Sequence, residues 1–233
     1  MSGDPTAPLK IPDGIVEAVY LDATHPSKPA KMAQSVGAPF YFRSNNDEPF
    51  RQAEILSNVH QHRITVESLD AADNLEVEKI DHTLAVVISQ DCDLEQDFKR
   101  RRSLTAEGNE TDQSDPKLLP TVLLCEVASE RTIDDAMRGQ GSTVREQFHQ
   151  NKLERYQFLR AVGPEDDALG EGLEAMGIDF KRYFTVPTTE LYAQLGAQCR
   201  RRCRLAPQYL EHLCLRFCHF ISRVALPKTH DEK

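Results

Sequence analysis

Leu84-Ala-Val-Val-Ile-Ser-Gln-Asp-Cys-Asp-Leu94 is the stretch that decides the fold. Its first half is an unbroken apolar run, too short for a typical helix and β-branched enough to predict a buried central strand. Its second half places one thiol between two carboxylates, Asp91-Cys92-Asp93, where that strand should end. We therefore expect this tripeptide to occupy a bend at the edge of the core, a position where functional residues are often found.

The composition is that of an ordinary globular protein. The 233 residues are 39% hydrophobic and 28% charged, and no apolar run approaches the ~20 residues of a membrane span. Because the N-terminus lacks a basic and apolar signal segment, we expect a cytoplasmic protein whose six cysteines are thiols or metal ligands. The net charge of −9 argues against general attraction to nucleic acid.

The pattern along the chain predicts an α+β fold. We expect a small, mostly antiparallel, SH3-like or barrel-like sheet with C-terminal helices packed on it. Besides the central run, strands are predicted at 51–59, 63–69, 121–127, 155–162 and 178–186.

Proline-rich, polar and helical segments set the predicted boundaries. Residues 1–48 are expected to be an N-terminal arm, 49–187 the barrel-like β domain, 188–227 a C-terminal helical hairpin, and 228–233 a disordered tail. Within the β domain we predict a long loop at 98–118 and a helical insertion near 132–151. The last helix should begin at Pro207, which suits a first helical position.

Cys92, with Asp91 and Asp93, forms the predicted catalytic group, and Ser89 and Gln90 beside it are predicted to bind ligand. A catalytic thiol needs a base, but the spacing of the histidines does not identify any one of them as that base. The adjacent carboxylates also disfavour the thiolate. The competing interpretation is a small buried side chain at a turn that the aspartates cap.

Metal sites have weaker support. The pair Asp91 and Asp93 resembles a magnesium-binding D-x-D, but no glycine-rich phosphate loop accompanies it. Two further sets could in principle bind metal: the spaced cysteines Cys199, Cys203, Cys214 and Cys218, and the histidines His60 and His62. Packed thiols and surface histidines are the favoured interpretations, so we predict neither a metal nor a cofactor.

Two basic clusters stand out, Arg100-Arg101-Arg102 and Arg200-Arg201-Arg202. A solvated surface is the favoured interpretation for each, and an RNA or phosphate surface is the alternative. Arg100, Arg101 and Arg102 are therefore included among the predicted binding residues.

Several of these segments together resemble a known family. The runs 50–59, 87–97 and 207–227 look like an uncharacterised bacterial family with an S-Q-x-C-D-L motif, which implies a bacterial cytoplasmic origin but no activity. A weaker similarity is to the PemK/MazF-like SH3-barrel proteins, in which Ala53-Glu54-Ile55, 86–89 and 122–127 would be the matching strands. Here Ala53 replaces the glycine of the PemK/MazF pattern.

Three functions follow as hypotheses. The first is a non-enzymatic interaction or regulatory subunit of a bacterial multi-protein system, such as one for antiviral defence, with a protein partner and no membrane. The second is a PemK/MazF-like endoribonuclease that binds RNA through its local arginine clusters. The third is a cysteine-dependent hydrolase or transferase centred on Cys92.

Overall fold

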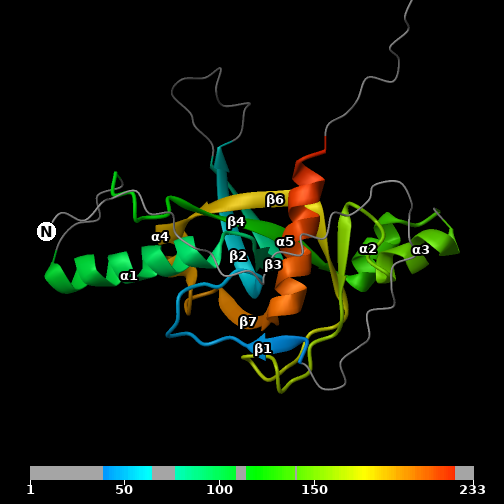
Figure 1. Ribbon diagram of the computed structural model, residues 1–233, viewed down its shortest axis with the longest axis horizontal. Coiled ribbons are helices and arrows are strands. Elements are labelled where there is room, and N and C mark those ends of the chain that lie inside the picture. The colour runs from blue at the N-terminus through cyan, green and yellow to red at the C-terminus, as the bar shows by residue number, and fades with distance from the viewer. Residues whose placement is uncertain (1–38, 65–76, 109–113, 140, 224–233) are drawn as a thin grey trace, which may run out of the picture. The chain divides into compact units, whose positions relative to one another are not determined.

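The computed structural model describes residues 39–64, 77–108, 114–139 and 141–223. These residues form an α+β fold with one seven-stranded antiparallel sheet and five helices (Figure 1). The strands are β1 (Tyr41–Arg43), β2 (Glu54–Ile64), β3 (Val77–Val87), β4 (Thr121–Ser129), β5 (Tyr156–Leu159), β6 (Met176–Pro187) and β7 (Arg200–Leu205). The helices are α1 (Asp91–Glu107), α2 (Glu130–Ala136), α3 (Ser142–His149), α4 (Thr188–Gln194) and α5 (Pro207–Ile221).

The strand order is β1-β7-β2-β3-β4-β6-β5. The predicted α+β class with a mostly antiparallel sheet is therefore confirmed. The ladder of hydrogen bonds has two ends, at β1 and β5, so the sheet is open and does not close into a barrel.

The apolar run of β3 lies in the middle of this order, as predicted. Its side chains alternate between two cores: Val86 and Ile88 face one, and Ala85 and Val87 face the other. All four are buried. A strand covered on both faces needs apolar residues at every position, which explains the unbroken run in the sequence.

Helices cover both faces of the sheet (Figure 1). Leu213, Phe217 and Phe220 of α5 join the core on one face. Leu94 of α1 and Leu191 of α4 join the core on the other. The sheet is thus the middle layer, and α1 carries the Asp91-Cys92-Asp93 tripeptide on its first turn.

The predicted loop at 98–118 is wrong over its first part, because α1 continues to Glu107. Pairs of opposite charge one turn apart stabilise this polar helix: Lys99 with Glu95 and Arg101 with Asp97. Gly108 ends the helix in the left-handed conformation with a φ of 70°.

The predicted C-terminal helical hairpin is also wrong. Helix α4 ends at Gln194, and the chain then forms strand β7 before α5 begins at Pro207. Strand β7 lies between β1 and β2, so this part of the chain completes the sheet instead of covering it.

The other predicted boundaries are only partly within the described residues. Helices α2 and α3 lie in the region of the predicted insertion near 132–151. Most of the predicted arm at 1–48 and all of the tail at 228–233 lie outside the described residues.

A buried ion pair fixes one side of β7. The Asp167 carboxylate is fully buried and accepts two hydrogen bonds from Arg202, at 2.8 and 2.7 Å. It also accepts from the backbone N–H groups of Leu169, Glu171 and Gly172. Burial alone would raise the pKa of Asp167, but these hydrogen bonds outweigh it and hold the pKa below its ordinary value.

We expect Asp167→Asn to lower the free energy of unfolding by about 3–5 kcal/mol, because Arg202 would stay buried without its counter-charge. Glu171→Gln is the matched control, since Glu171 contacts the same guanidinium but its side chain is 68% exposed. Its effect should stay below about 1 kcal/mol. Urea unfolding of both variants measures the difference, and equal losses would contradict the role given to Asp167.

The same pair predicts a dependence on pH. Because the folded-state pKa of Asp167 is lowered, the pair stabilises fully above the unfolded-state pKa of about 4 and loses this contribution as pH falls further. Urea unfolding between pH 6 and about 3 should therefore show a smaller acid-induced loss in Asp167→Asn than in the wild type. An identical loss in both would contradict the assignment.

Candidate functional site

The turn between β3 and α1 is held by the residues predicted to bind ligand or catalyse. The Ser89 hydroxyl accepts a hydrogen bond from the Leu123 N–H at 2.9 Å. Gln90 precedes the first residue of the helix. The Asp91 carboxylate accepts from the Gln52 N–H at 2.7 Å. Ser89 and Asp91 therefore join three chain segments, which is a structural use of both side chains.

Cys92 is exposed on the first turn of α1. Its sulfur lies 3.6 Å from the Gln90 Oε1 and 3.6 Å from the Asp93 Oδ1. No imidazole among the described residues contacts the sulfur, so the geometry provides no general base for Cys92.

The Arg100-Arg101-Arg102 cluster lies on the same helix, with Arg102 about 15 Å along the axis from Cys92. Arg100 donates to Asp115 at 2.6 Å, and Arg101 donates to both oxygens of the buried Asp97 at 2.9 and 2.8 Å. No carboxylate of the described residues lies within ion-pair distance of Arg102. The predicted site residues therefore do not converge, and Arg102 is the one cation of this cluster left for a ligand.

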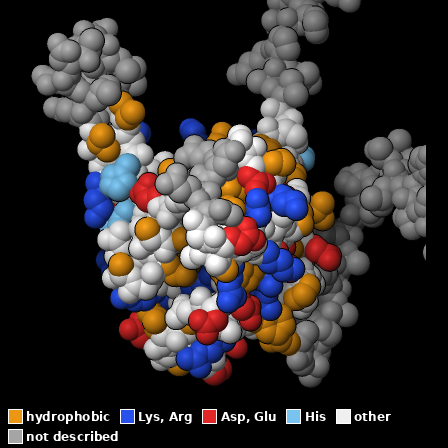
Figure 2. All heavy atoms as spheres, turned by 90° about the vertical axis from the view of Figure 1, so that its left-hand side faces the viewer, with side chains coloured by type: hydrophobic (Ala, Val, Ile, Leu, Met, Phe, Trp, Pro, Cys, Tyr) orange, Lys and Arg blue, Asp and Glu red, His pale blue; other side chains and the backbone are white. Residues whose placement is uncertain are grey.

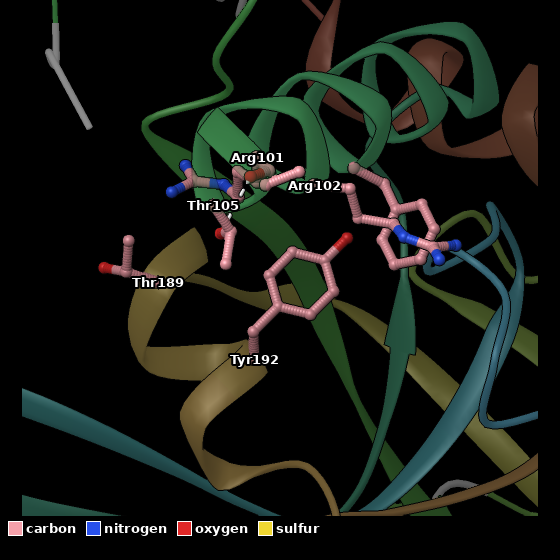
Figure 3. A pocket seen from close by; sticks show the side chains of 7 residues that line it. Arg101, Arg102, Thr105, Thr189 and Tyr192 are labelled. Carbon is pink, nitrogen blue, oxygen red and sulfur yellow. Dashed lines mark hydrogen bonds between the residues drawn. The ribbon is translucent and has the colours of Figure 1, made fainter. Parts of the chain in front are cut away.

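Arg102 borders a groove of about 570 Å³ between α1 and α4. Its guanidinium lies over the Phe98 ring, 5.6 Å from the centroid. Tyr192 rises from α4 with its hydroxyl directed toward α1 (Figure 3). The remaining walls are Arg101, Thr105, Ala106 and Thr189.

Two features keep the groove in shape. The Thr105 hydroxyl donates to the Arg101 carbonyl at 3.0 Å, and the Tyr192 ring packs against Phe50 with centroids 4.8 Å apart. Burial raises the pKa of Tyr192 to about 12, and Asp97 adds to the rise. The hydroxyl is therefore a hydrogen-bond donor at neutral pH.

Sequence reasoning missed Phe98, Thr189 and Tyr192 as site residues. Phe98 falls in the predicted loop at 98–118, and strands β4, β5 and β6 separate α4 from α1 along the chain. Only the packing of both helices on the same face brings these side chains together, and no local pattern signals that.

The second basic cluster is used inside the fold. Arg201 donates to Glu54, and Arg202 to Asp167; all four side chains are largely buried. The favoured interpretation of Arg200-Arg201-Arg202 as a solvated surface is therefore wrong for Arg201 and Arg202, and so is the alternative of an RNA or phosphate surface.

The histidines and cysteines do not assemble a metal site within the described part of the chain. His60 is paired with Asp81, and His62 with Glu190 at 2.6 Å. Cys199 and Cys203 lie at β7, and Cys214 and Cys218 on α5. No group of three or more histidine, cysteine or carboxylate side chains among the described residues has a geometry that could hold a metal ion.

Comparisons with models of protein families and with curated proteins found no match to this chain. The resemblances to the S-Q-x-C-D-L family and to PemK/MazF-like proteins stay predictions. No helix within the described ranges is long and apolar enough to cross a membrane.

The thiols should differ sharply in reactivity. Burial raises the pKa of Cys125 and Cys199 to about 12, and it raises the pKa of the buried Cys203 as well. With iodoacetamide at neutral pH, we expect labelling of the exposed Cys92 and Cys218 and protection of the three buried thiols until the protein unfolds. Mass spectrometry of peptides after timed labelling measures this.

The same labelling tests a catalytic Cys92. Without a base in contact, Cys92 should react no more than about tenfold faster than Cys218. A much faster reaction at Cys92 would support the cysteine-dependent hydrolase or transferase, which stays a prediction here.

Proposed function

We propose that this protein is a non-enzymatic interaction or regulatory subunit of a bacterial multi-protein system, such as an antiviral defence assembly. The groove between α1 and α4 would hold a segment of the partner protein. The observation that carries the proposal is the Arg102 guanidinium, which has no ion-pair partner among the described residues and lies above Phe98 and beside Tyr192 in an open groove.

The chemistry of the groove suits a peptide that is both acidic and apolar. Phe98, Ala106 and the Tyr192 ring offer surface for an aromatic or aliphatic side chain. Arg102 lacks a counter-charge among the described residues, so a partner carboxylate would gain a charge-assisted hydrogen bond there. Aromatic and arginine side chains are those that most often dominate binding at protein interfaces.

A PemK/MazF-like endoribonuclease with an SH3-like sheet is our alternative. A guanidinium over an aromatic ring can also bind an unstacked base, and this arrangement favours the alternative. Against it, Arg100 and Arg101 are held by Asp115 and Asp97. Binding RNA would require several phosphates to be neutralised, and Arg102 alone supplies one contact.

Fluorescence anisotropy with two labelled probes separates the two functions. One probe is a peptide of alternating Glu, Phe and Leu, and the other is a single-stranded oligouridine RNA. We expect the peptide to bind, and Arg102→Glu to weaken its binding at least about tenfold, because the carboxylate would meet a like charge.

Arg138→Glu is the matched control, since Arg138 is exposed on a different part of the surface and, within the described ranges, pairs with Asp135 alone. It should leave peptide binding within about twofold. If the peptide does not bind, or binds equally to Arg102→Glu, the groove is not the partner site. RNA binding that falls steeply with salt, together with RNA cleavage, would replace the proposal with the endoribonuclease.

A further inference from the structure

The C-terminal part of β2 and the N-terminal part of β3 extend beyond the rest of the sheet. Strand β7 pairs with β2 only over Glu54–Ser57, and β4 pairs with β3 only over Leu84–Val87. The remainder, 59–64 paired with 77–82, forms a two-stranded arm (the β2–β3 arm) that projects from the sheet (Figure 1). Figure 2 shows it standing out from the described surface, with histidine, basic and hydrophobic side chains on it.

The two edges of the arm differ. On the β2 edge, the Gln194 side chain imitates a neighbouring strand: it accepts from the His60 N–H at 2.9 Å and donates to the His60 carbonyl at 2.8 Å. On the β3 edge, no described residue makes a backbone hydrogen bond with Val77–Thr83. A two-stranded ribbon is marginal in water, and an open edge is a template for another strand.

The β3 edge is complementary to itself. Lys79 and Asp81 lie on the same face, one on each side of Ile80, and pair with each other at 3.3 Å, while Asp81 is also paired with His60. Their side chains are nevertheless 49% and 67% exposed, so both charges can also reach a neighbouring strand. In an antiparallel pair with a two-fold axis at Ile80, Lys79 stands opposite Asp81 of the partner subunit, and Asp81 opposite Lys79 of the partner subunit. Both cross-strand pairs then join opposite charges, which stabilises such a pairing.

Charged residues usually protect an open edge against pairing, because like charges would meet across it. Here one partner avoids that repulsion. In an antiparallel copy centred on Ile80, Lys79 and Asp81 each meet a residue of opposite charge. We propose that the open edge of β3, Val77–Thr83, is the interface of a symmetric dimer, with a second copy of this chain as its occupant. The dimer joins two seven-stranded sheets across the two β2–β3 arms.

A charge swap tests the register. Sedimentation equilibrium should find a dimer of the wild-type protein. Lys79→Glu and Asp81→Lys should each raise the dissociation constant at least about tenfold, because each puts like charges together in both symmetric pairs. The double variant restores opposite charges and should return to within about threefold of the wild type.

Arg63→Glu is the matched control, because it makes the same change of charge on the β2 strand of the arm and breaks a cross-strand pair with Glu78. It should leave dimerisation within about threefold. Thermal unfolding of each variant distinguishes a lost interface from a lost fold.

A cross-link tests the axis itself. In a background of Cys92→Ser and Cys218→Ser, which removes the two exposed thiols, Ile80→Cys should form a covalent dimer on mild oxidation. Thr83→Cys in the same background should not, because it would face Val77 of the partner subunit. The proposal is overturned if the wild-type protein is a monomer at about 100 μM. It is also overturned if the dimer neither responds to the charge variants nor cross-links at position 80.

Discussion

The rest of the structure depends on the ion pair between Arg201 and Glu54, whose side chains are each 1% exposed. The guanidinium donates to both Glu54 oxygens and to the carbonyls of Glu48 and Pro49, and it lies over the Phe50 ring. Burial raises the pKa of Glu54 above its ordinary value, and Arg201 opposes that rise. Removing either partner would leave a charge in the core, so β7 is held in one position beside β2.

Strand β7 shows why part of the fold could not be predicted from sequence. Its run Arg200-Arg-Arg-Cys-Arg-Leu205 has neither the apolar alternation of a strand nor the spacing of a helix, because two of its arginines are buried against carboxylates on opposite faces. Their partners, Glu54 and Asp167, are far away in sequence. Strand β4 and the apolar end of β3, by contrast, were predicted close to their observed positions, because hydrophobic burial leaves a direct pattern in the chain; the polar half of β3, from Val77 to His82, lacks that pattern and was not predicted as a strand.

Helix α1 limited the prediction of the site in a different way. The second half of α1 is almost entirely polar. The apolar pattern of this segment is therefore too weak to identify a helix, and the segment was predicted as part of a loop. The pair Asp97 and Arg101, one turn apart, was the available signal. Because Cys92 and Arg102 lie at separate positions along that helix, the predicted site residues do not form one site. They belong instead to two places, the structural turn between β3 and α1 and the groove between α1 and α4.

The net charge also gave a misleading view of the surface. Most of the excess of Asp and Glu over Lys and Arg lies in 1–38, 65–76, 109–113 and 224–233, outside the described residues, and the described residues are nearly balanced. On a surface of nearly balanced charge, long-range electrostatic attraction contributes little to the choice of a binding partner. Selectivity for a partner depends instead on individual charges that lack a counter-charge, or on the order in which positive and negative charges alternate. Arg102, which has no counter-charge in the described part of the chain, is a case of the first kind, and the sequence Lys79-Ile80-Asp81 on an open strand edge is a case of the second.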